Sequence, residues 1–175
     1  MRAWLKRNRW GLLALPLLVL ALPLPQIDRY YNVFVAAPYR VAVEAPPGEQ
    51  VSYGGGRMWL VSAQPFRPVD HFGDPVSVPA GFTFIHAVVG FKVDTGDALS
   101  ACSIFLEDSL GRRHGPDPVA LTRTPYRSDT CMDLEGRSLT FQADLYFLLP
   151  PGADPAAIRI ELDRERPRFV RLLAR

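Results

Sequence analysis

The sequence has 175 residues, of which 22% are charged and 11% aromatic, and it contains two cysteines. This length suits one domain with its own core in addition to an N-terminal segment. Four of the 20 basic residues precede Trp10 and all 18 acidic residues follow it, so the rest of the chain carries 16 basic and 18 acidic side chains. That balance excludes the strongly basic surface on which nucleic-acid binding depends.

The N-terminal region predicts export and a membrane anchor. Residues 1–9 form a basic flank, and residues 10–27 are apolar except for Gln26. A basic flank stays in the cytoplasm while the chain after the apolar run is translocated. No small-x-small cleavage site follows directly, so we expect an uncleaved signal anchor, with a cleaved signal peptide as the alternative. The prediction is a single-pass protein of the cell membrane, with its N-terminus cytoplasmic and its C-terminal domain extracytoplasmic.

Residues 28–48 contain Pro38, Pro46 and Pro47 and are expected to form a stalk, although residues 39–43 also suit an extended edge segment. The β domain is expected over residues 49–163. Its first signal is a hairpin, in which residues 50–53 and 57–63 flank three glycines that suit a tight turn. Residues 82–93 are apolar on nearly both faces, which is typical of a central strand.

Three further segments alternate apolar and polar residues, as half-buried strands do. They are residues 102–107, which run into a turn at residues 108–111, residues 139–149 and residues 158–162. In the second segment we expect Phe141, Leu145 and Phe147 to point inward. Short strands separated by turns predict an all-β protein with an antiparallel β-sandwich. Residues 164–175 are expected to form a basic C-terminal tail in solvent, with a docked strand or helix, or a contact with an anionic surface, as alternatives.

Cys102 and Cys131 are the only cysteines. An even number of cysteines in an exported domain predicts a disulfide, because that compartment is oxidising. Closing a loop of this size contributes about 3–4 kcal/mol in the chain-entropy model. The bond would hold the polar insertion that follows residue 111 against the sheet.

The order of these segments resembles one group of proteins. A strand at residues 82–93, the sequence Ile-Phe-Leu-Glu-Asp-Ser-Leu-Gly at 104–111, a polar insertion, and strands at residues 141–150 and 158–162 are similar to exported immunoglobulin-like domains of membrane-anchored, actinobacterial-type proteins. The resemblance covers residues 55–162 at most. It implies an immunoglobulin-like antiparallel β-sandwich preceded by a single N-terminal transmembrane helix, and it implies no catalytic residues.

The sequence contains no motif of a known catalytic centre, no phosphate-binding loop and no nucleotide-binding glycine pattern. Asp70, His71 and Asp74 could bind a divalent ion, but isolated loop groups of this kind usually stay solvated, and the carboxylates near Cys131 match no calcium-loop spacing. We therefore expect no metal, no cofactor and no enzymatic activity. The residues 64–76 are the strongest candidate binding loop. Phe66, His71 and Phe72 lie in it, and the two aromatic residues are unusual for a solvated loop. The alternative is that these two aromatic side chains pack back onto the core.

The predicted function is therefore that of a binding or accessory module for another envelope protein or a ligand, held near the membrane by its N-terminal helix. One alternative is a subunit or regulator of a membrane transport complex. A small extracytoplasmic enzyme is the third.

Overall fold

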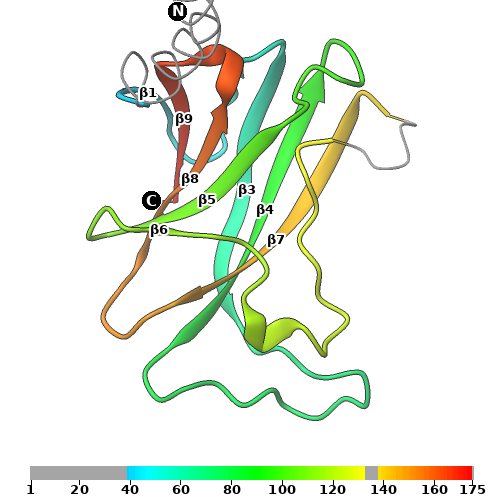
Figure 1. Cartoon of the computed structure of the whole chain (residues 1–175), viewed down its shortest axis with the longest axis vertical. Coiled ribbons are helices and arrows are strands. Elements are labelled where there is room, and N and C mark those ends of the chain that lie inside the picture. Colours follow the sequence, from blue (N-terminus) through cyan, green and yellow to red (C-terminus); the bar gives the residue numbers. More distant parts are fainter. Residues whose placement is uncertain (1–38, 133–137, 175) are drawn as a thin grey trace, which may run out of the picture. The chain divides into compact units, whose positions relative to one another are not determined.

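The computed structural model describes residues 39–132 and 138–174, which form two β-sheets (Figure 1). The predicted flank and anchor, and the stalk up to residue 38, lie outside the described residues. Within the described ranges, no helix has the length and apolar character needed to cross a membrane. The helical elements there are two single 3-10 turns, η2 (Val119–Leu121) and η3 (Asp163–Glu165).

The five-stranded sheet has the order β1-β9-β8-β5-β6, and the four-stranded sheet has the order β2-β3-β4-β7. Strands β1 and β9 are parallel, whereas every other pair of neighbours is antiparallel. In the five-stranded sheet the bounds are Val41–Ala45 (β1), Arg168–Leu173 (β9), Pro155–Leu162 (β8), Cys102–Asp108 (β5) and Arg113–His114 (β6). In the four-stranded sheet they are Val51–Tyr53 (β2), Gly56–Phe66 (β3), Thr83–Val93 (β4) and Thr140–Leu149 (β7). The prediction of an all-β sandwich is confirmed.

The predicted hairpin is β2 and β3, with Tyr53 opposite Gly56. Its two turn residues, Gly54 and Gly55, have φ values of 60° and 76°, a region that residues with a β-carbon rarely adopt. The predicted central strand is β4, which lies between β3 and β7. Its inward residues alternate along the strand and join the core.

The core lies between the two sheets, and the period of two along β7 supplies much of it. Leu145 and Phe147 are fully buried, and Phe141 packs at the edge of the core with its ring 5.2 Å from that of Phe91. On β8, Ile158 and Ile160 are fully buried. The predicted inward face of β7 is confirmed.

The C-terminal region differs from the prediction. Residues 168–173 do not form the expected solvated tail but strand β9, between β1 and β8, which corresponds to the alternative of a docked strand. Val170 and Leu172 are fully buried in the core, and Arg171 on the other face lies 2.7 Å from Glu107. An arginine-rich segment becomes a strand here because carboxylates on other strands neutralise its charges.

The C-terminal part of the predicted stalk is a strand, in line with the alternative of an extended edge segment. Residues 41–45 form β1, which pairs with β9 in parallel and adds the edge of the five-stranded sheet. The sandwich therefore extends from residue 41 to residue 173, beyond both predicted limits. Ala45 is buried at the end of this strand, whereas Val41 is half exposed.

Residues 115–131, called the covering segment below, run along the free edge of β7. The amide groups of Asp117 and Asp129 donate to the carbonyls of Tyr146 and Asp144 at 3.0 and 2.8 Å. The amide of Tyr146 donates to the Ser128 hydroxyl at 2.9 Å. These bonds satisfy strand edge groups that would otherwise be open to another chain.

The predicted disulfide is confirmed. Cys102 at the start of β5 is bonded to Cys131 at the end of the covering segment, and their Cα atoms are 6.2 Å apart. The segment is also held by packing, which the sequence analysis did not anticipate, since Leu121 is 1% exposed.

Candidate binding site

The candidate site is built on the connection between β3 and β4, whose first part is a tight turn. The Asp70 carboxylate accepts hydrogen bonds from the amide groups of Phe72 and Asp74 at 2.8 and 3.0 Å. Gly73 completes the turn with a φ of 90°. This carboxylate-capped turn is held by its own hydrogen bonds, and it leaves the Phe72 side chain 92% exposed at its tip.

The two arms of this turn stay together. Val69 and Pro75 form an isolated antiparallel bridge, and the amide of Val76 donates to the carbonyl of Pro68 at 3.0 Å. The chain then returns to β4 through Gly81, which has a φ of 80° and lies against Pro151. A β-carbon at residue 81 would come within 2.8 Å of the Pro151 ring, so the return path is closely packed.

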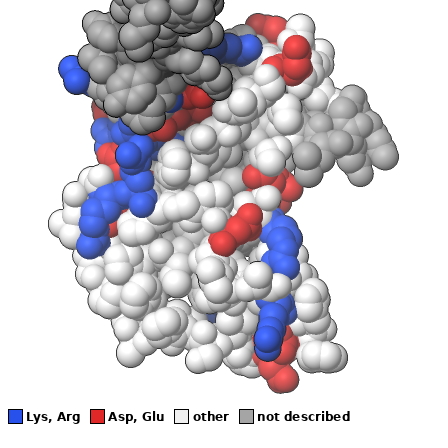
Figure 2. Space-filling model, in the orientation of Figure 1, with Lys and Arg blue, Asp and Glu red and all other residues white. Residues whose placement is uncertain are grey.

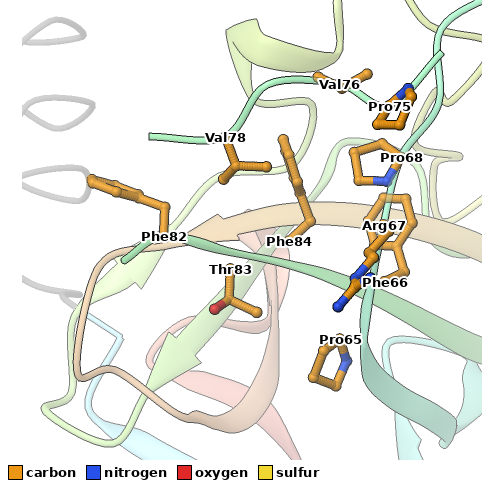
Figure 3. A pocket seen from close by; sticks show the side chains of 10 residues that line it. All are labelled: Pro65, Phe66, Arg67, Pro68, Pro75, Val76, Val78, Phe82, Thr83 and Phe84. Atoms are coloured by element: carbon orange, nitrogen blue, oxygen red, sulfur yellow. The ribbon is translucent and has the colours of Figure 1, made fainter. Parts of the chain in front are cut away.

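A groove of about 470 Å³ lies between this connection and the ends of β3 and β4. Figure 3 shows Val78, Phe82 and Phe84 on one side of it and the residues from Pro65 to Pro68 on the other. Pro75 and Val76 lie at a third side. Eight of its ten lining residues are proline, phenylalanine or valine, and the remaining two are Thr83 and Arg67.

Phe66 connects the groove to an aromatic cluster on the outer face of the four-stranded sheet. Its ring lies 5.8 Å from that of Phe84, 5.4 Å from Tyr126 and 5.3 Å from Tyr146. Tyr126 belongs to the covering segment, so this segment and β3 pack on each other through the cluster. Burial raises the pKa of the Tyr146 hydroxyl, and the nearby Asp144 carboxylate raises it further.

A second hollow of about 620 Å³ lies on the other side of Pro75 and Val76. It is lined by Asp70 and Ser77 and by residues of the covering segment around η2, among them Val119, which is 87% exposed. The residues 75–76 therefore form a ridge between the groove and this hollow.

The structure separates the three residues that the sequence singled out. Phe66 lines the groove and joins the aromatic cluster, whereas Phe72 and His71 are exposed on the turn and do not line the groove. No local sequence signal marks Phe82, Phe84 and Val119 as residues of a groove or hollow. Phe84 belongs to a strand that looked like core, and nothing local indicates that it points outward into a groove.

Two histidines are paired with carboxylates. His86 Nε2 lies 2.6 Å from Asp144 on the outer face of the four-stranded sheet. His114 Nε2 lies 2.9 Å from Asp108, whose side chain is fully buried and also accepts from Arg112 and from the amide of Leu110. Burial alone would raise the pKa of Asp108, but these hydrogen bonds outweigh it and hold the pKa well below its usual range. This carboxylate therefore organises the β5–β6 turn.

Charged side chains on the outer face of the five-stranded sheet pair with one another. Arg159 lies between Glu107 and Glu161 and stacks 3.6 Å above the Phe169 ring. On the face shown in Figure 2, acidic and basic side chains lie next to each other, with no broad area of one sign. Among residues 39–132 and 138–174, no group of three or more metal-ligating side chains is present.

Comparison with known proteins gives no family. No protein-family model matches the sequence, and no curated protein matches it. The structure is similar to the crystal structure of MPT63, a secreted protein from Mycobacterium tuberculosis, with a TM-score of 0.48 and 12% identity, covering 78% of this chain and 98% of that chain. It is also similar to an uncharacterized β-sandwich protein from Clostridium difficile 630, with a TM-score of 0.40 and 10% identity, covering 75% of this chain and 95% of that chain. At these values neither protein bears on the function of this chain.

Proposed function

We propose that this chain is an exported binding module, anchored in the cell membrane by residues 10–27, that holds an envelope partner or ligand at the groove between Pro65 and Phe84. The observation that carries the proposal is the apolar lining of that groove next to an exposed aromatic tip. Ligand sites are concave and mostly apolar, and loops on a rigid sandwich are where such sites form.

The exposed apolar residues near the groove support this proposal. Phe72, Phe82 and Val119 are 92%, 37% and 87% exposed and belong to the segments that line the groove and the second hollow or adjoin them. Single exposed apolar residues are ordinary, but several around one concave surface are typical of an interaction site. Phe72 adds nothing to the core, and its turn is already stabilised by the Asp70 carboxylate.

The disulfide supports the exported location, because such bonds persist in oxidising compartments. The strand order supports an immunoglobulin-like sandwich. The orders β3-β4-β7 and β9-β8-β5 correspond to the A-B-E and G-F-C strands of that fold. The bond between Cys102 and Cys131 differs from the usual bond of antibody domains, which joins strands B and F.

Within the described domain, the groove lies at the end opposite the point where residue 39 enters. Tyr39, at the start of the described chain, donates a hydrogen bond to Asp163, and the neighbouring Arg164 donates to the carbonyl of Gly54. The chain therefore enters the domain at the Gly54 end of β3. The groove is at the Phe66 end of the same strand, about 33 Å away at ~3.3 Å per residue.

In vivo cross-linking of the intact protein, followed by its purification from membranes, tests this proposal. The double variant F72S/V119S should lose the cross-linked partner at least fivefold, because it removes the exposed apolar tips without touching the core. The matched control is V61S/L139S, which changes two half-exposed apolar residues that belong neither to the lining of the groove or the second hollow nor to the turn at residues 70–74. Equal recovery of the partner by both variants would contradict the proposal.

A further inference from the structure

We propose that the groove binds a small amphipathic anion, an apolar chain that ends in a carboxylate. Its chain would lie against Val78 and Phe82, and its carboxylate would pair with the Arg67 guanidinium. This inference rests on the proposed function, since it takes the groove as the binding surface and names the class of ligand.

The size and lining of the groove suit the apolar part of such a ligand. A volume of about 470 Å³ is within the range of small-molecule sites, which is ~300–1,000 Å³. Val78 and Phe82 form one accessible apolar side of the groove, whereas Phe84 is 1% exposed and lies beneath its surface (Figure 3). Displacing water from these surfaces favours an alkyl chain over a polar molecule.

The charged residue in the groove indicates where the polar end of the ligand would bind. Arg67 is the only charged residue in the groove lining, and its side chain forms no ion pair or hydrogen bond with the rest of the described chain. Arg112, Arg159 and Arg171 pair with carboxylates. Arg40, Arg57 and Arg123 also pair with no described residue, but among these arginines it is Arg67 that lines the groove. A guanidinium beside an apolar groove is complementary to a carboxylate, which it binds through two parallel hydrogen bonds.

The backbone of the groove disfavours an extended peptide. A peptide that adds to a sheet edge needs main-chain donors and acceptors. Pro65, Pro68 and Pro75 have no amide hydrogen, and the amides of Val76 and Phe82 already donate to the carbonyls of Pro68 and Pro79 at 3.0 and 3.1 Å. The groove therefore offers side-chain contact and one charge, which suits a small amphiphile.

Photoaffinity labelling of the full-length chain in non-ionic detergent tests this inference. The probe is decanoate with a photoreactive diazirine in its chain, and the comparison probe is the corresponding alcohol. Labelled residues are mapped by mass spectrometry. We expect labelling between residues 65 and 84, about tenfold weaker with the alcohol and about tenfold weaker in R67Q. The matched control R57Q removes another exposed arginine that pairs with no described residue, near the opposite end of β3. Its labelling should equal that of the wild type.

The outcomes separate this inference from the proposed function. Equal labelling of the groove by the acid and the alcohol, unchanged in R67Q, would overturn the carboxylate assignment and leave the groove as a binding surface. No labelling of residues 65–84 by either probe would overturn the ligand class, whereas loss of the cross-linked partner in F72S/V119S would still support the proposed function. An intact disulfide and an unchanged melting temperature would show that R67Q is folded.

Discussion

Trp59 on β3 lies directly opposite Gly90 on β4, and its indole fills the space that a β-carbon at Gly90 would need. Both residues are on the outer face of the four-stranded sheet. Gly90 has an ordinary backbone conformation, so the requirement for glycine comes from the indole alone.

The variant G90A should lower the free energy of unfolding by about 1–3 kcal/mol, because the new methyl group displaces the indole. Urea unfolding measures the change. In the W59L background, G90A should lower the free energy of unfolding by less than half as much, because the indole is absent. The control G115A adds a methyl group in open space, and a loss there equal to that of G90A would contradict the explanation.

The variant D108N should lower the free energy of unfolding by about 2–3 kcal/mol at pH 7, because a buried acceptor of four hydrogen bonds is weakened. Asp108 has a lower pKa in the folded chain than the ordinary value of about 3.9, so its stabilisation is present above that pH. It is lost as the pH falls below about 4 toward the folded pKa.

Urea unfolding between pH 7 and pH 3 checks both statements. The wild type should lose stability in the acidic part of this range more steeply than D108N does. The control D74N changes an exposed carboxylate of the turn at residues 70–74. Its free energy of unfolding should change with pH in the same way as that of the wild type. Parallel curves for the wild type and D108N would contradict the assigned role.

Tyr53 joins the two sheets, since its hydroxyl donates to the carbonyl of Arg168 at 3.0 Å and accepts from the amide of Leu162 at 3.1 Å. The variant Y53F leaves a buried amide without its acceptor and should cost about 1–2 kcal/mol of unfolding free energy. Y126F is the control, because it keeps its ring in the aromatic cluster and its hydroxyl bonds no described residue.

Burial raises the pKa of Tyr53 to about 12, and the hydrogen bond from Leu162 only partly offsets this. The unfolded value is about 10, so the neutral hydroxyl contributes stability below pH 10 that is lost as the pH rises from 10 toward 12. Thermal unfolding at pH 8 to 11 should show a steeper alkaline decline for the wild type than for Y53F. The same slope in both would show that the Tyr53 hydroxyl is not responsible.

The double variant C102S/C131S should lower the free energy of unfolding by about 3–4 kcal/mol, because the unfolded chain is no longer closed over 29 residues. Hydrogen exchange adds a regional test. The amide of Asp129, close to Cys131, should exchange faster, whereas the amides near buried Leu121 should stay protected. Unchanged stability of the reduced protein would mean that packing alone holds the covering segment.

Local sequence patterns were sufficient to predict the strands that have a clear periodicity or turn signal of their own. The period of two in β7 requires one face to be buried, and a shift by one residue would bring Asp144 and Tyr146 into the core. The glycines at 54 and 55 determine the tight turn because other residues rarely reach its backbone angles. The two cysteines permit one intramolecular bond, so its partners follow once export is assumed.

The remaining features of the fold and the groove depend on contacts between residues that are far apart in the sequence. The arginine-rich end of the chain looks like a tail until Glu44 and Glu107, far away in the sequence, neutralise Arg171 and allow β9 to enter the sheet. Phe84 lies on the outward face of β4 and is nevertheless buried, because Phe66 and the β3–β4 connection cover it. The groove exists only where these segments meet. Its shape and its single unpaired charge depend on side chains brought together by folding, and no local period in the sequence encodes that arrangement.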